Sequence, residues 1–304
     1  MKKVLEIIFL AFISILACSC HKFTIGDTAR KALTVETPFQ IVEFRDDVNV
    51  TLLHGTPEHP AGTVLIEAGT NLIDNIHAEV EPTEEDNGYG SQKFNKLVIT
   101  NDNSLNYLHS YDYTIEMTVY YDSLQHLIFH SNATDIHTDT LRGFNCKTTF
   151  THDTLTWDSL ASNLLIELEG GAGNFNVLAN CCWVRTKFIH GTSNIKLCGF
   201  ADMVSTYADY DCHGVIDESE MEADYHFITS YGTNTISAKA FNTFNAKNYN
   251  VGRIYYVKYQ KPAKVTIWGH FDENHHWIPQ QIVDTVYSCP LNLIKSGSNI
   301  LPMP

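Results

Sequence analysis

An acidic run at residues 217–224 holds the side chains best suited to bind a cation. Asp217, Glu218 and Glu220 could supply several carboxylate oxygens, and hard divalent cations prefer oxygen ligands. The alternative is a local β-bulge that turns the run into solvent, since an extra residue breaks the alternation of a strand. We favour the bulge, and we predict a chain with no metal ion and no cofactor.

Aromatic residues recur at one position of a repeated pattern in the second half of the chain. The residues at this position are Ser131, Phe150, Gly170, His190, Tyr210 and Tyr231. With the nearby Tyr207, the two tyrosines could form an exposed strip on which a ligand stacks. Buried rings would instead stabilise neighbouring strands as an aromatic ladder. The buried arrangement is the commoner one, and both remain open.

Motifs for common enzyme chemistries are missing from the sequence. It contains no GxSxG, GxGxxG or P-loop pattern, which removes support for acyl hydrolysis and for dinucleotide or nucleotide binding. We therefore predict a protein that is not an enzyme and has no catalytic residues. The alternative is a polysaccharide lyase or a glycoside hydrolase, which would need paired carboxylates in a groove. The run 217–224 is the only obvious source of such a pair.

Composition limits the class of protein. The chain has 304 residues, 44% of them hydrophobic, which is enough to bury a sizeable core. A formal net charge of -15 repels phosphate backbones, so we predict no nucleic-acid partner. The 15 tyrosines and 16 phenylalanines, with few prolines, favour β structure.

The N-terminus has the pattern of an export signal. Lys2 and Lys3 precede a mostly apolar stretch at 4–17, which is too short to span a bilayer as a helix. The sequence Ile15-Leu16-Ala17-Cys18 resembles a bacterial lipobox, and this resemblance implies lipidation of Cys18 after cleavage. Two or more acyl chains anchor a protein stably to a membrane. The alternatives are lipidation of Cys20 and an ordinary cleaved signal.

The second half of the chain repeats at about 20 residues. An apolar residue follows a polar turn at Ile136, Leu155, Phe175, Ile195, Val215, Ile236 and Val265. A strand–turn–strand unit of this length cannot bury its apolar face alone, whereas stacked units can. The pattern predicts an all-β fold, a right-handed single-stranded parallel β-helix with rungs of ~20 residues. Asp217 would then share the inward column of Val215, and an antiparallel sandwich is the alternative.

The N-terminal half resembles a known family. The segments that carry the resemblance are Phe39–Leu52, Thr63–Val80, Leu97–Ile99 and Tyr113–Leu127. In this order they are similar to the opening strands of the family described as "putative auto-transporter adhesin, head GIN domain". The resemblance covers about residues 39–269, and it implies a β-helical, secreted or lipid-anchored envelope protein. It implies no activity, because the family has no motif-defined catalytic residues.

These observations together give an expected organisation. The expected segments are a signal peptide at 1–17, a lipidated tether at 18–36, an N-terminal β region of the head GIN domain at 37–125, β-helix rungs at 126–270 and a C-terminal cap or tail at 271–304. We expect a lipoprotein on the outer membrane, on its periplasmic face or at the cell surface. Its function would be adhesin-like binding of a glycan or an envelope protein, and the alternative is a structural part of an envelope assembly.

Overall fold

The protein is built from β-strands. The computed structural model describes residues 26–45, 48–86, 91–103, 115–130, 163–170, 173–257, 263–264, 270–271, 277–278, 286–287 and 292–304. These residues form strands and one 3-10 helix, η2 (Ile73–Asn75), with no α-helix among them. The expected all-β class is therefore correct. Within these ranges, no helix has the length and apolar character needed to cross a membrane.

Several expected features lie outside the described residues. These are Cys18 with the whole signal segment, Ser131 and Phe150, and the repeat positions Ile136, Leu155 and Val265.

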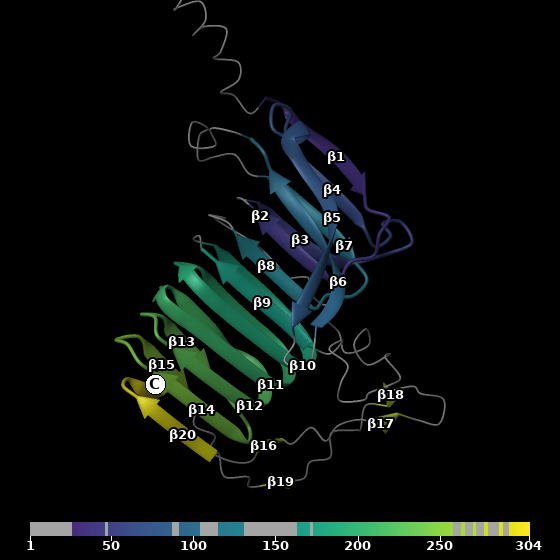
Figure 1. The fold of residues 1–304 in the computed structure, drawn as a ribbon. Coiled ribbons are helices and arrows are strands. Elements are labelled where there is room, and N and C mark those ends of the chain that lie inside the picture. Colours follow the sequence, from purple (N-terminus) through teal and green to yellow (C-terminus); the bar gives the residue numbers. More distant parts are fainter. Residues whose placement is uncertain are drawn as a thin grey trace, which may run out of the picture.

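A four-stranded sheet lies at the N-terminal end of the molecule (Figure 1). Its strands, in spatial order, are β1 (Thr28–Thr34), β4 (Thr63–Gly69), β7 (Glu116–Tyr121) and β3 (Asn49–His54). β1 runs antiparallel to β4, and β4 runs antiparallel to β7, whereas β3 and β7 are parallel. β1 falls within the segment expected to be a tether, so this part of the tether is folded into a sheet.

A 13-stranded sheet forms most of the molecule. Its strands are β2 (Ile41–Arg45), β5 (Ile76–Asp86), β6 (Ser91–Asn101), β8 (His126–His130), β9 (Asn163–Glu169), β10 (Asn174–Gly191), β11 (Asn194–Cys212), β12 (Val215–Ser230), β13 (Thr235–Ala238), β14 (Thr243–Asn248), β15 (Arg253–Tyr256), β20 (Asn292–Gly297) and β21 (Ile300–Pro302). The main path is β21-β15-β13-β12-β11-β10-β9-β8-β2-β6-β5, and β14 joins β12 to β20. All pairs are parallel except β5–β6.

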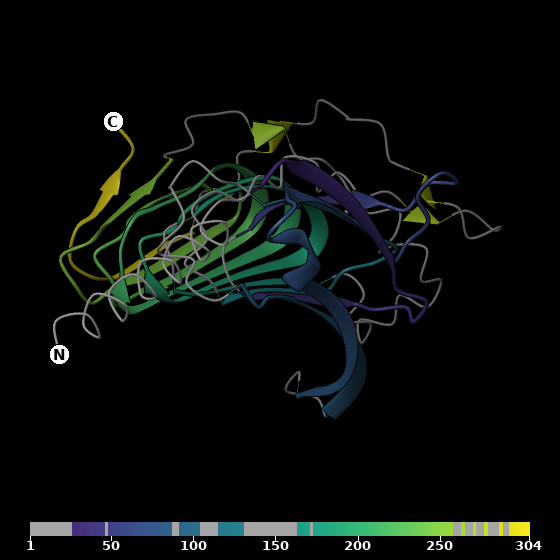
Figure 2. The same cartoon turned by 90° about the horizontal axis from the view of Figure 1, so that it is seen from above.

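The sheets are therefore mixed, which differs from the purely parallel arrangement expected from the repeat. The antiparallel pairs involve only strands before residue 122, apart from two short ribbons, β16 (Ala263–Lys264) with β19 (Val286–Tyr287) and β17 (His270–Phe271) with β18 (Trp277–Ile278). In Figure 2 the β5–β6 hairpin extends away from the rest of the molecule. The ~20-residue period is absent from this part of the sequence, so no pattern of that kind could predict its pairing.

The repeat positions pair across the parallel strands, with one correction. Phe175 pairs with Ile195, as the repeat predicts. Ile195, however, pairs with Ile216, and Ile216 pairs with Ile236. Ile216 is buried, whereas Val215 is 46% exposed. The predicted anchor Val215 is wrong by one residue because the step from β11 to β12 contains an extra residue.

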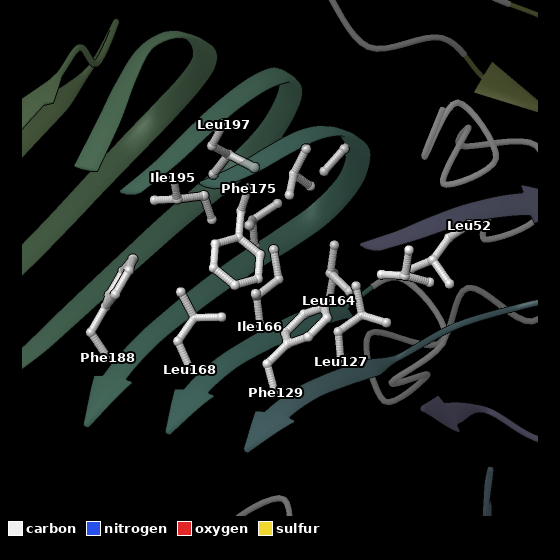
Figure 3. Packing of buried hydrophobic residues seen from close by; sticks show 14 of the residues in the cluster. Leu52, Leu127, Phe129, Leu164, Ile166, Leu168, Phe175, Phe188, Ile195 and Leu197 are labelled. Atoms are coloured by element: carbon white, nitrogen blue, oxygen red, sulfur yellow. The ribbon is translucent and has the colours of Figure 1, made fainter. Parts of the chain in front are cut away.

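Each long strand contributes two halves to one core. In β10 the burial alternates up to Cys181, and after the outward pair Cys182–Trp183 it resumes at Val184. Two consecutive outward residues bend the strand, so that both halves turn the same side inward. Figure 3 shows the result. The side chain of Phe175, in the first half of β10, points toward Ile166 of β9, the strand that pairs with the second half of β10.

The C-terminal residues continue the parallel pairing. β20 pairs with β14 and β21 pairs with β15, although the segment from residue 271 was expected to leave the pattern as a cap or tail. Ile300 continues the buried position of Ile254. Residues 292–302 thus form a further layer of the sheet.

Candidate binding surface

Four tyrosines form a column at the ends of successive parallel strands. Tyr207 and Tyr210 lie in β11, Tyr231 directly follows β12, and Tyr249 directly follows β14. The Tyr231 ring centroid lies 4.9 Å from that of Tyr210, 4.9 Å from that of Tyr249 and 6.1 Å from that of Tyr207. Tyr231 and Tyr249 are stacked, with 15° between their planes. We call these four residues the tyrosine column.

The column is accessible to solvent. Tyr210 is 64% exposed, Tyr249 is 53% exposed and Tyr207 is 36% exposed, while Tyr231 is half-buried between its neighbours. Of the two arrangements open from the sequence, the structure has the exposed strip rather than the commoner buried ladder. The reason is local: the preceding Ser230 and Asn248 point inward, so the next residue of each strand points outward.

The sequence missed one member of the column. Tyr249 occupies the position on β14 that corresponds to Tyr231 on β12, because the preceding residues, Asn248 and Ser230, are paired. The two tyrosines are 18 residues apart in the sequence rather than about 20. A search that allowed the repeat to shorten would have found it. At the other end, the His190 ring lies over Gly170, where a Cβ atom would come within 3.0 Å of Nε2. Gly170 also has φ +95°, which suits glycine alone.

Carboxylates flank the tyrosines. Asp209 accepts a hydrogen bond from the Tyr210 backbone N–H at 2.8 Å, and Asp211 is exposed on the other side of Tyr210. Burial, with the charge of Asp209 adding to it, raises the pKa of the Tyr207 phenol. A tyrosine hydroxyl is protonated at neutral pH even without such a shift, so the phenol can donate a hydrogen bond. The column thus combines flat apolar rings, hydroxyl groups and negative charge.

The three carboxylates predicted as cation ligands, Asp217, Glu218 and Glu220, do not converge. Asp217 accepts hydrogen bonds from the Ser219 hydroxyl and backbone N–H, and the exposed Glu220 pairs with Lys196 at 2.7 Å. Glu218 instead points into the core and is 0% exposed. A β-bulge is present, as favoured from the sequence. Lys196 pairs with Asp217, but Cys198 pairs with Glu220, so β12 has one extra residue between these two pairs. Glu218 points inward without the bulge, because it lies two residues after the buried Ile216 on the same side of β12, so the inward position predicted for Asp217 belongs to Glu218.

Glu218 is held by a closed set of hydrogen bonds. The Thr206 hydroxyl lies 2.7 and 2.9 Å from its two oxygens, and Thr186 lies 3.3 Å from one of them. His226 Nε2 lies 2.8 Å from the other oxygen, and Nδ1 lies 3.0 Å from the Lys239 carbonyl. A carbonyl only accepts, so Nδ1 carries a proton, and a second proton must lie between Nε2 and Glu218. With His226 also 0% exposed, this cluster is closed to any ligand.

Asp202 and Asp224 form the other pair of acidic groups in the parallel region. They occupy adjacent positions on β11 and β12, at the bend of both strands, because Ala201 pairs with Ala223 and Met203 with Tyr225. Burial, and then the charge of Asp224, raises the pKa of Asp202 to about 7, and burial raises the pKa of Asp224. Neither residue lines either of the two hollows of the described surface given below.

Two hollows of the described surface lie elsewhere. One, of about 580 Å³, is open and is lined by Gln40, Pro82, Thr83, Glu84, Lys93, Phe94 and Asn95. The other, of about 200 Å³, is formed by the 35–40 segment together with Ala61, Gly62, Asp122 and Ser123. The first is lined by a single acidic residue, Glu84, and so lacks the carboxylate pair that glycoside hydrolysis requires, and the second is lined by Glu36 and Asp122. Within the described part of the chain, no group of three or more His, Cys, Asp or Glu side chains could hold a metal ion.

Several solved structures match the chain, and the match with a TM-score above 0.5 shows a shared fold. A crystal structure of a putative adhesin from Bacteroides fragilis matches with a TM-score of 0.56 and 16% sequence identity, over 92% of this chain and 98% of that chain. A putative adhesin from Parabacteroides merdae matches with a TM-score of 0.40 and 13% identity, over 92% and 97% of the two chains. A putative lipid binding protein from Parabacteroides distasonis matches with a TM-score of 0.47 and 12% identity, over 92% and 98%.

A family model matches most of the chain. No curated protein matches the chain. The model described as "Putative auto-transporter adhesin, head GIN domain" matches residues 38–259, which include the tyrosine column and the strands that hold it. The chain therefore belongs to this family, as its N-terminal segments predicted.

Proposed function

We propose that the protein is a non-catalytic, adhesin-like binding module of the bacterial cell envelope. The tyrosine column is the contact surface, and its exposure is the observation that carries the proposal. Rigid aromatic side chains lose little conformational entropy on binding and offer both apolar area and a hydroxyl group. Membership of a family named for adhesins and the fold shared with a putative adhesin support this role.

The parallel region would give the column its rigidity. We infer that it is a right-handed single-stranded parallel β-helix, which follows the N-terminal β region at 37–125 and is extended by β20 and β21. The support is its pairing pattern: from β9 to β15, residues 18–22 positions apart are neighbours on adjacent strands. Strands held on both sides by backbone hydrogen bonds fix the rings at one spacing before a ligand arrives, which lowers the entropy lost on binding.

A lipid anchor would place the module at the outer membrane. The lipobox-like sequence before Cys18 supports cleavage after residue 17 and acylation of Cys18. Labelling cells that express the full chain with a palmitate analogue tests this. Label should appear on the wild type and on Cys20→Ser and should be lost in Cys18→Ser. Label that persists in Cys18→Ser contradicts the assignment.

A second candidate function is a structural role in an envelope assembly. It is favoured by exposed apolar side chains on the last two strands of the sheet, Leu293, Ile294 and Leu301. Exposed apolar residues on a strand edge are a common site of association between chains. Sedimentation of the detergent-solubilised chain tests this role: an assembly that Ile294→Lys disrupts supports it, and a monomer at all concentrations contradicts it.

Binding to envelope fragments tests the main proposal. Full-length chain, purified in detergent, should sediment with envelope fragments of the source bacterium, and the Tyr210→Ala/Tyr249→Ala double variant should not. Tyr225→Ala is the matched control, because Tyr225 is 40% exposed but lies outside the column. The same mixtures should release no new reducing ends. Equal binding by the double variant, or turnover of envelope polysaccharide, overturns the proposal.

A further inference from the structure

The geometry of the tyrosine column restricts what it can bind. β11 and β14 lie on opposite sides of β12, so Tyr210 and Tyr249 cover Tyr231 from opposite sides. The ring of Tyr231 is consequently closed to a ligand on both faces. The accessible ring surfaces are those of Tyr210 and Tyr249, the two most exposed members of the column.

The hydroxyl groups of the column are available for a ligand. In the described structure, none of the hydroxyls of Tyr210, Tyr231 and Tyr249 takes part in a hydrogen bond, whereas the hydroxyl of the nearby Tyr225 accepts one from Asn242. A tyrosine hydroxyl both donates and accepts. A row of such groups at the strand spacing of about 4.8 Å matches a ligand that carries many hydroxyls of its own.

Charge excludes one large class of ligand. Asp209 and Asp211 flank Tyr210, and the chain as a whole carries a formal charge of -15. An anionic polymer would be repelled by this field at moderate ionic strength. An uncharged ligand has no such penalty, and its hydroxyl groups can donate hydrogen bonds to the two carboxylates.

The width of the column argues against a folded protein as the ligand. The neighbours of the rings are polar: Asn250 donates a hydrogen bond to the Tyr231 carbonyl, and His213 bonds to Thr233 beside it. A stable protein interface covers about 800 Å² on each partner around a dry centre, which a strip one side chain wide does not offer. A narrow chain of flat, hydroxylated rings fits this shape better.

We propose that the tyrosine column binds an uncharged glycan chain, with sugar rings stacked on Tyr210 and Tyr249 and sugar hydroxyls bonded to Asp209 and Asp211. This inference rests on the proposed binding function and names its ligand class. The C–H face of a pyranose ring packs on an aromatic face as other apolar groups do. The carboxylates fix the orientation of the sugar and select against acidic sugars.

Affinity electrophoresis of the full-length chain tests the ligand class. The gels contain neutral polysaccharides (α- and β-glucans, a mannan, a galactan and a xylan), polygalacturonate as the polyanion, and a chitosan oligomer as the polycation. At least one neutral polysaccharide should retard the wild type. Tyr210→Ala and Tyr249→Ala should each weaken retardation about fivefold to tenfold, as expected for one lost aromatic contact. Tyr225→Ala should behave as the wild type, and polygalacturonate should have no effect.

The outcomes separate this inference from the proposed function. If no neutral polysaccharide retards the chain, or if only chitosan does and salt abolishes the effect, the glycan inference fails. The binding function survives that result when the double variant still loses its attachment to envelope fragments. If envelope binding is unchanged in the double variant, the column is not the contact surface and both fail. Equal retardation of the wild type and the column variants also overturns the inference.

Discussion

Two buried carboxylates, in different regions of the molecule, are neutralised in different ways. Glu43 lies on β2 next to the N-terminal strands, 3% exposed, and Glu218 lies in the parallel region, 0% exposed. Glu43 is paired with Arg45 and Lys96, and His130 lies 3.5 Å away. Glu218 has two threonine hydroxyls and one histidine.

The difference follows from which side of the strand each carboxylate occupies. Val42 and Phe44, the neighbours of Glu43, point into the core, so Glu43 lies on the opposite side of β2. There, Arg45 of the same strand and Lys96 of the adjacent β6 reach it while their stems contact the sheet. Glu218 points between the two halves of the long strands, where its partners are the hydroxyls of Thr186 and Thr206 and the imidazole of His226. On the outer side of the sheet, ion pairs with cationic side chains therefore compensate the charge of Glu43. On the inner side, threonine hydroxyls donate hydrogen bonds to Glu218.

The largest expected effect is the loss of Glu218. Glu218→Ala leaves the His226 Nε2 proton and two threonine hydroxyls without their acceptor in a closed core, which should lower the free energy of unfolding by about 3–5 kcal/mol. Glu220→Ala, which removes an exposed pair with Lys196, should cost about 0–1 kcal/mol. Urea denaturation followed by circular dichroism measures both.

A double variant strengthens this test. Glu218→Leu with His226→Phe replaces the whole polar cluster by apolar groups, and buried ion pairs replaced in this way are often neutral or stabilising. A double variant as unstable as Glu218→Ala, or a Glu218→Ala variant within about 1 kcal/mol of the wild type, would contradict the role assigned to the cluster.

A smaller loss is expected for Glu43. Glu43→Ala should lower the free energy of unfolding by about 2 kcal/mol, because the unpaired cations can reach water, unlike those of a fully buried pair. The Arg45 side chain is 43% exposed already. Glu67→Ala is the control, since it removes only the exposed pair with Arg30. A loss for Glu43→Ala equal to that for Glu218→Ala would remove the distinction between the two sides of the sheet.

Two carboxylates within the parallel region, Asp202 on β11 and Glu167 on β9, should respond to pH with opposite sign. The pKa of Asp202 is raised to about 7, so the folded state holds a proton that the unfolded state has released above about pH 4. Stability from this group is therefore greatest at low pH and is lost as the pH rises through 7. Asp202→Asn should stabilise the protein by about 1–2 kcal/mol at pH 8, after allowance for solvent screening, and by little at pH 4.

Glu167 provides the contrast. Hydrogen bonds from His126 and Lys187 hold its pKa at about 2, against the effect of burial, so its contribution is present at neutral pH and is lost as the pH falls through that value. Glu167→Gln should destabilise the protein at pH 7 and less so at pH 3. Thermal unfolding from pH 3 to pH 8 measures both variants. Curves that shift in the same direction would show that the two carboxylates are not held in opposite protonation states.

The smallest effect on stability is expected in the tyrosine column. Tyr210 packs mainly against Tyr231 and is largely exposed. Tyr210→Ala should therefore change the free energy of unfolding by about 1 kcal/mol at most. Urea denaturation checks this. A loss of several kcal/mol would show that the ring is part of the core packing and would explain a binding defect by unfolding.

The sequence predicted the parts of this structure that depend on a regular period. It placed Phe175 beside Ile195 and brought Tyr210 and Tyr231 to one position of the repeat. It missed what depends on single insertions: the step from Ile195 to Ile216 is one residue longer than the step from Phe175 to Ile195, which places Val215 outward and Glu218 inward, and no regular period reveals an insertion. Exposure of the tyrosines depends on how each strand ends, and the antiparallel pairing of β1 with β4 is a long-range contact without a local pattern.

The alignment and exposure of the tyrosine column can be measured by nitration of the folded chain with tetranitromethane, followed by peptide mapping. Tyr210 and Tyr249 should react first, Tyr231 should react more slowly because both of its faces are covered, and the buried Tyr121 should react only after unfolding. Tyr231 reacting as fast as Tyr210, or Tyr210 and Tyr249 resisting nitration as Tyr121 does, would contradict an exposed column and the binding surface proposed on it.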